Sequence, residues 1–227
     1  MLGAQMMQLV SVNVSKPRDV TAHGRTIRTG IFKEPVAGRV FMRALNIDGD
    51  GQASLKVHGG IHMAVYAYPH EHYEFWAREL GRNDLRSGQF GENLTVTGLL
   101  EEEVHIGDRF RIGAAVVEVT QPRVPCSKLA FKMNLPQFPK QFLASGRSGF
   151  YLRVLEEGEI GAGDRIERVH VDAGRVTVRQ VNWLVHFDKK NAGLARRAVR
   201  IAALSPEWRE RIAEQLAKLE QDRATAE

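Results

Sequence analysis

The chain has 227 residues, of which 43% are hydrophobic and 26% charged, as in an ordinary folded protein of one or two domains. Its net charge of +5 could suggest nucleic-acid binding, but basic and acidic residues alternate along the chain, so we expect no direct nucleic-acid binding. Neither a membrane-spanning apolar run nor an export signal is recognised, and the single cysteine suits a reducing compartment. We therefore expect a cytoplasmic protein that does not contact membranes.

Up to about residue 173, short apolar runs are broken by Gly, Asp and Pro. The segments 117–120 and 150–156 alternate with period two, which is typical of half-buried strands. HIGDRFRI from His105 resembles GAGDRIERV from Gly161, and in each a Gly-Asp pair turns the chain into an alternating strand. This pattern favours a sheet that curls into a closed or partly closed barrel.

One helix is expected within this region, in PHEHYEFWAREL from Pro69. Tyr73, Trp76 and Leu80 form a single apolar stripe at spacings of three and four, and Gly81 follows as a stop signal. The stripe predicts a helix that packs against the barrel.

The periodicity changes to that of helices after Gly174. Thr177 and Gln180 form a capping-box pair that opens a helix through His186, and a second helical stretch runs over about 191–204. A third helix starts at Ser205, whereas the tail after residue 219 lacks periodicity and is expected to be loose. We predict an α+β protein, with a barrel domain over residues 1–173 and a small three-helix bundle over residues 174–227.

The first candidate site segment is KVHGGIHMAVYAYPHEHY, which begins at Lys56. His58 stands beside Gly59 and Gly60, which can adopt φ > 0 and so let backbone N–H groups converge on an anion. A glycine turn with an incidental histidine explains the pattern equally well. The later histidines of this segment lack the HExxH spacing, so no zinc site is predicted.

The second segment is SGQFGENL from Ser87, in which two glycines bracket Phe90. A backbone loop approaching a ligand, with Asn93 as a polar anchor, is one interpretation; taken alone, the pattern better fits a β-bulge or turn. DGDGQ from Asp48 resembles a calcium loop, but its twelfth position is Gly59 instead of Glu, so we interpret it as a turn.

The third segment is VTQPRVPCSKL, which contains the only cysteine of the chain, Cys126. Two prolines stiffen the strand exit, and Arg123 and Lys128 supply nearby cations that favour a thiolate. A buried structural cysteine would more often lie in an apolar run. This segment therefore predicts that Cys126 is functional.

Together and in this order, GDGQASLKVHGG, YPHEHYEFWAREL, FGENLTVTGL, GDRF and QPRVPCSKL resemble the YiiM-type MOSC proteins. The region after Gly174 is similar to that family's C-terminal three-helix domain, so the resemblance covers nearly the whole chain. One segment and one residue depart from the family pattern. Ile61-His62-Met63 stands where the family commonly has an acidic residue followed by Lys or Arg, and Phe150 stands where Trp is expected.

The resemblance implies a MOSC β-barrel that binds a molybdenum cofactor (molybdopterin), with Cys126 as the metal ligand. A soft thiolate suits this metal, and the phosphate of the cofactor requires cationic and backbone N–H donors. The cofactor-binding residues that it implies are Lys56, His58, Gly59, Gly60, Phe90, Gly91, Asn93, Arg123 and Lys128.

It further implies a molybdenum-dependent oxidoreductase that reduces N-hydroxylated compounds, including hydroxylaminopurine-type base analogues, and so detoxifies them. His58 is a candidate proton donor for this catalytic site. Two alternatives remain open, a sulfur-transfer protein with a Cys126 persulfide and a carrier of the cofactor without turnover. A Cys–His hydrolase is a more distant alternative, because no orienting acid is evident.

No motif for a second redox centre occurs, so an external flavin or iron–sulfur protein is expected to deliver electrons to the small-molecule reaction. Five cations in the predicted helical region have no acid between them: Lys189, Lys190, Arg196, Arg197 and Arg200. They predict a docking surface for an acidic partner, although a solvated helix face is at least as good an interpretation.

Overall fold

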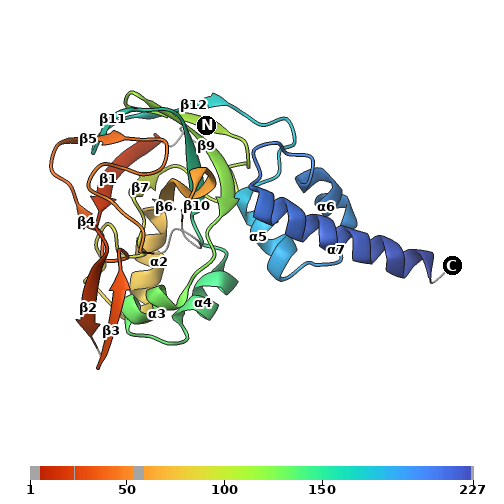
Figure 1. Ribbon diagram of the computed structural model, residues 1–227, viewed down its shortest axis with the longest axis horizontal. Helices are drawn as coiled ribbons and strands as arrows, with labels where there is room; N and C mark the ends of the chain where they lie inside the picture. Colours follow the sequence, from red (N-terminus) through yellow and green to blue (C-terminus); the bar gives the residue numbers. More distant parts are fainter. Residues whose placement is uncertain (1–5, 23, 54–58, 226–227) are drawn as a thin grey trace.

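The computed structural model describes residues 6–22, 24–53 and 59–225 (Figure 1). The α+β class is confirmed, because a large mixed sheet is combined with helices. The strands are β1 (Gln8–Val14), β2 (Arg18–Ala22), β3 (Arg25–Thr29), β4 (Glu34–Pro35), β5 (Arg39–Met42), β6 (Val65–Pro69), β7 (Leu94–Thr97), β8 (Arg109–Ile112), β9 (Ala115–Pro122), β10 (Phe150–Glu156), β11 (Gly158–Gly161) and β12 (Ile166–His170). The helices are the short 3-10 helix η1 (Ile61–Met63), α2 (Glu71–Leu80), α3 (Ser127–Met133), α4 (Phe138–Ser145), α5 (Val178–His186), α6 (Ala192–Ala198) and α7 (Pro206–Ala224).

Eight strands form the main sheet in the order β12-β8-β9-β10-β6-β7-β1-β4. Its pairs are antiparallel except β6 with β7, and two small two-stranded sheets, β11-β5 and β2-β3, accompany it. The sheet curls, because the amide of Leu9 in β1 donates to the carbonyl of Asp164 just before β12 at 2.9 Å. The strand order is nevertheless open, so the closed β-barrel expected from the sequence is not confirmed in the described residues.

Helix α2 confirms the prediction from the Tyr73 and Trp76 stripe, since both side chains are buried and Gly81 ends the helix at φ 60°. Two further helices were missed, because one helix alone was expected before residue 173. These are α3 and α4, which have seven and eight residues and are too short for a clear periodicity. Helix α3 begins directly after Cys126, which occupies its N-cap position.

The three C-terminal helices were predicted, and the capping box of Thr177 and Gln180 is present at the start of α5. Helix α6 ends at Ala198, several residues before the expected boundary at 204. The expectation of a loose tail after residue 219 was wrong, because α7 continues to Ala224. An ion pair at 2.9 Å between Arg196 of α6 and Glu220 links this last part of α7 to the bundle.

Two hydrophobic clusters hold the molecule together. The larger cluster runs from the sheet into α5, α6 and α7. It includes Phe150, whose side chain is fully buried and packs in this core. Helix α5 packs against β9, so the helical region and the sheet share one core (Figure 1). The domain boundary at residues 173 and 174 therefore stays a prediction.

The smaller cluster is aromatic and lies among β6, α2, α3 and α4. Tyr68, Trp76, Phe90 and Phe142 are four of its buried rings, with centroids 4.5–6.4 Å apart for the pairs that include Phe90. Close packing of large rings makes this part of the molecule stiff. The cluster therefore forms a rigid base for the segment that carries Cys126.

Candidate functional site

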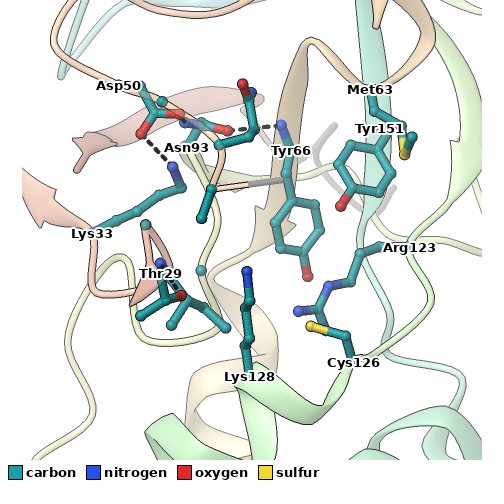
Figure 2. Close-up of a pocket in the computed structure, with 16 residues that line it drawn as sticks. Thr29, Lys33, Asp50, Met63, Tyr66, Asn93, Arg123, Cys126, Lys128 and Tyr151 are labelled. Atoms are coloured by element: carbon teal, nitrogen blue, oxygen red, sulfur yellow. Dashed lines mark hydrogen bonds and ion pairs between the residues drawn. The ribbon is translucent and has the colours of Figure 1, made fainter. Parts of the chain in front are cut away.

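A cavity that is open to solvent lies between the sheet and the N-terminus of α3 (Figure 2). Segments far apart in the sequence line it: the loops after β3 and β5, η1, β6, the segment before β7, the β9–α3 connection and β10.

Among the described helices, none combines the length and the apolar composition that a membrane span requires.

Cys126 lies on one wall of this cavity, half-buried at the N-cap of α3. Lys128 follows in the first turn of the same helix and also lines the cavity. In Figure 2 the guanidinium of Arg123 and the thiol of Cys126 lie together, with the ammonium of Lys128 beside them. The two cations and the N-terminal end of α3 give this wall a positive character that complements a bound anion or a metal thiolate.

Arg123 is the most buried cation on this wall, with 4% of its surface exposed. Its guanidinium carbon lies 5.2 Å from the ring centre of Tyr66 and 5.4 Å from that of Phe142, so it contacts two aromatic faces. Its Nη1 is buried and has no hydrogen-bond partner among the described residues. A buried unmet donor of this kind predicts an external acceptor in the cavity.

The pKa of Arg123 shows how tightly the groups on this wall interact. Burial acts to lower this pKa, but nearby groups, first among them Tyr66 and Tyr151, act to raise it; the pKa lies above its ordinary value and the guanidinium stays charged. Burial also raises the pKa values of Tyr66 and Tyr151, which keeps both phenols protonated as hydrogen-bond donors. The Tyr66 hydroxyl donates to the carbonyl of Ser148 at 2.8 Å.

A buried ion pair forms the opposite wall, where Lys33 donates to Asp50 (Figure 2). Asp50 also accepts from the amide of Ser15 at 2.9 Å and from the side-chain amide of Asn93 at 2.9 Å. Burial lowers the pKa of Lys33, and Asp50 offsets part of this effect.

Asn93 fixes the position of this wall relative to the sheet. Its side-chain oxygen accepts from the backbone amide of Tyr66 at 3.1 Å, and its Nδ2 donates to the carbonyl of Asn13 at 3.3 Å as well as to Asp50. One side chain thus connects β1, β6 and the loop after β5. Its amide groups are used in these contacts, so Asn93 shapes the cavity chiefly by positioning its neighbours.

Glu92 holds the loop that precedes Asn93. Its carboxylate is fully buried and accepts hydrogen bonds from the backbone amides of Gly88 and Phe90, at 2.8 and 3.0 Å. Gly91 lines the cavity with φ 84°, and a Cβ on it would lie 2.7 Å from Ile31. Only glycine fits this position without strain, because L-residues avoid that region of φ.

Lys132 ties two loops of the cavity together from α3. Its Nζ donates to the carbonyl of Ile31 at 3.0 Å and to that of Gly88 at 2.7 Å. Burial lowers its pKa to about 8, although Glu92 and Glu34 partly counter this effect. The two bonded loops carry Gly91 on one side and Lys33 on the other, so Lys132 maintains the width of the cavity.

The structure brings five of the predicted site residues together around one cavity: Gly91, Asn93, Arg123, Cys126 and Lys128. Phe90 is fully buried in the aromatic cluster and is not among the described residues that line the cavity, so its expected role in cofactor binding stays a prediction. Gly60 adopts φ 89° before η1, while Gly59 lies beside it; neither lines the cavity. Lys56 and His58 lie outside the described residues.

Several cavity residues were not predicted from the sequence: Thr29, Lys33, Asp50, Tyr66 and Tyr151. Asp50 belongs to the DGDGQ stretch that the sequence analysis interpreted as a turn, and Lys33 belongs to no motif. Of the departing segment Ile61-His62-Met63, only Met63 lines the cavity, whereas Ile61 is exposed. The departure therefore places a thioether at the cavity wall.

Comparison with known proteins defines the class. Residues 54–167 match the MOSC domain, and the chain belongs to the MOSC family, whose domains are associated in general with molybdenum-cofactor binding. The curated protein YflK of Bacillus subtilis is 44% identical over 201 residues, with 88% of this chain and 90% of that protein covered. This confirms the resemblance drawn from the sequence motifs.

Within the family the chain is similar to YiiM proteins, because residues 176–219 match the YiiM-like 3-alpha helix domain. The crystal structure of YiiM from Geobacillus stearothermophilus has a TM-score of 0.79 and 39% identity, covering 92% of this chain and 99% of that one. A protein named Reductase from Gibberella moniliformis is 40% identical over 148 residues, which are 64% of this chain but 26% of that protein.

Proposed function

We propose that the protein is a molybdenum-cofactor-dependent reductase of N-hydroxylated compounds. The observation that carries the proposal is that the Cys126 thiol shares one open cavity with the buried Nη1 of Arg123, which has no hydrogen-bond partner among the described residues. A soft thiolate is a suitable ligand for a redox-active metal, and an arginine with an unmet donor is suited to a phosphate oxygen. Membership of the MOSC family and the similarity to a protein named Reductase support it.

The residues on the Cys126 wall fit such a cofactor. Cys126 would ligate the metal, while Arg123 and Lys128 would hold the anionic part of the cofactor from the same wall. Lys56 and the glycines at 59 and 60 remain predicted contacts from the neighbouring segment. Arg123 is buried and already contacts two aromatic rings, so little of its side-chain freedom would be lost on binding.

The proposed reaction is R–NHOH + 2 e⁻ + 2 H⁺ → R–NH₂ + H₂O. When bound, the cofactor supplies the two-electron redox chemistry. The chain itself binds and orients the substrate in the open cavity, where protons can enter from solvent. His58 remains a candidate proton donor from the sequence analysis.

Electrons would come from an external flavin or iron–sulfur protein. The similarity to a much longer reductase, of which this chain spans about a quarter, is compatible with a separate electron donor. The substrates that we propose are small N-hydroxylated molecules such as hydroxylaminopurine-type base analogues, which would be detoxified in the cytoplasm. A reducing compartment keeps the Cys126 thiol available to a metal.

Two alternatives use the same cavity. In a sulfur-transfer protein Cys126 would carry a persulfide, and in a carrier the cofactor would be bound without turnover. Substrate turnover separates the reductase from both, since neither alternative predicts loss of the N–O bond of a hydroxylamine.

The test is reduction of a hydroxylamine by protein expressed with an intact cofactor pathway, with a small chemical reductant as the electron source. We expect catalytic turnover by the wild-type protein and almost none by Cys126→Ser, in which a hard hydroxyl replaces a soft thiolate. Equal turnover per folded molecule of the two proteins would contradict the proposal.

A further inference from the structure

The Lys33–Asp50 pair lines the cavity on the wall across from Cys126 (Figure 2). Its burial is nearly complete, with 8% of the Lys33 side chain and 1% of the Asp50 side chain exposed. A buried ion pair adds little net stability, because the loss of hydration offsets the attraction between the charges. Stability alone therefore does not explain why this pair borders an open cavity.

Asp50 is held rigidly and in turn holds Lys33. The backbone amide of Ser15 and the side chain of Asn93 each donate to Asp50 at 2.9 Å, in addition to the bond from Lys33. An ammonium group carries three N–H donors, and this ion pair uses one of them. Lys33 is thus a positioned cation with further donor capacity beside the cavity.

We propose that Lys33 is the proton donor to the departing hydroxyl group of the substrate and that Asp50 is its positioning residue. This inference rests on the proposed function and deepens it. The N–O bond would break as two electrons arrive from the reductant. The Lys33 ammonium would give a proton to the hydroxyl oxygen, so that the hydroxyl group leaves as water and the nitrogen becomes the amine. The second proton comes from solvent, which also reprotonates Lys33 through the open cavity.

The charged groups around Lys33 are compatible with this role. Burial lowers its pKa, while Asp50 and Glu92 act in the opposite direction. Lys132 extends from α3, and the positive charges of Lys132 and Lys33 disfavour each other. Arg123 and Lys128 lie on the opposite wall. A lysine whose pKa is reduced toward the working pH is a better general acid than an exposed one.

The decisive variant is Lys33→Arg, which keeps a positive charge opposite Asp50 but does not release a proton near neutral pH. We expect kcat to fall on the order of 100-fold, as for loss of a general acid, while molybdenum content stays at the wild-type value. In the wild-type enzyme kcat should decline above the pKa of Lys33, and this alkaline decline should vanish in Lys33→Arg. Lys140→Arg, exposed on α4, is the matched control and should leave kcat unchanged.

Asp50→Asn provides a second, independent variant. Removing the carboxylate removes an influence that raises the pKa of Lys33, so the alkaline decline in kcat should begin at lower pH. Titration of the ¹³Cε resonance of Lys33 in labelled protein should give the same pKa as the kinetic profile. A structural lysine would change melting temperature and molybdenum content together and would not move this pH dependence.

The outcomes separate the two proposals. Turnover by the wild-type enzyme with an unchanged alkaline decline in Lys33→Arg overturns the role of Lys33 alone. No turnover by the wild-type enzyme contradicts the proposed function and with it the role of Lys33. Should Lys33→Arg fail to fold, the shift in Asp50→Asn decides, and an unshifted profile there overturns the inference.

Discussion

Replacing Glu92 with Gln should loosen the loop that forms one edge of the cavity. The fully buried carboxylate accepts four hydrogen bonds, from the amides of Gly88 and Phe90, from Thr95 at 3.0 Å and from the hydroxyl of Tyr73. Three of these bonds go to Oε1, and only the bond from Phe90 goes to Oε2. Glutamine keeps one oxygen, which can take the place of Oε1. Its NH₂ group would then face the backbone N–H of Phe90, and neither of these two donors would have an acceptor.

The expected cost follows from this single mismatch. A hydrogen bond to a charged group contributes about 1.5–3 kcal/mol, and an unmet buried donor costs about 1–3 kcal/mol. We therefore expect Glu92→Gln to lower the free energy of unfolding by about 2.5–6 kcal/mol. Because Gly91 belongs to the same loop and lines the cavity, molybdenum content per folded molecule should fall as well.

Urea unfolding of the wild type and the variant, followed by circular dichroism, measures this difference. The matched control is Glu79→Gln, an exposed position of α2, which should change the free energy of unfolding by less than about 0.5 kcal/mol. A loss below about 1 kcal/mol in Glu92→Gln would show that the charge of Glu92 does not hold the loop.

Two other predictions concern lysines outside the Lys33–Asp50 pair. Burial lowers the pKa of Lys132 to about 8 in the folded protein, whereas its ordinary pKa is 10.5. Between these two pH values the unfolded chain holds the proton and the folded chain does not, so the contribution of Lys132 to the free energy of unfolding should rise with pH. Urea unfolding at pH 7 and pH 10 should show this rise in the wild type and not in Lys132→Met. For docking, Arg196 is paired with Glu220 and Arg197 donates to the carbonyl of Gly174, so the exposed Lys189 and Lys190 are better sites for charge reversal. Their replacement by Glu should slow turnover driven by an acidic flavin or iron–sulfur protein and spare turnover with a small chemical reductant. Equal losses in both assays would contradict the docking hypothesis.

The local parts of the fold could be predicted because their signals are contiguous. Thr177 and Gln180 satisfy each other's backbone groups within four residues, and the stripe of α2 is complete within one helix. The tail was misjudged because Arg196, which pairs with Glu220, lies 24 residues earlier in the chain. Whether the curled sheet closes depends on contacts between its first and last strands, and no local pattern records these.

The site divides in the same way. Arg123, Cys126 and Lys128 were predicted because one segment carries them, with prolines that constrain the backbone. Lys33 and Asp50 come from two other segments, and they reach the cavity through bonds such as that from Asn93 to Asp50. A lysine and an aspartate in separate loops have no spacing that links them, so only the folded arrangement reveals this wall.

The most direct test of the account is the molybdenum and pterin content of the purified protein, determined by mass spectrometry after expression with an intact cofactor pathway. We predict close to one molybdenum and one pterin per wild-type chain. Cys126→Ser should keep its melting temperature and retain some pterin through Arg123 and Lys128, while its molybdenum should be held less tightly. Wild-type protein without molybdenum or pterin under these conditions, or a Cys126→Ser variant with wild-type metal content and turnover, would contradict the central claim.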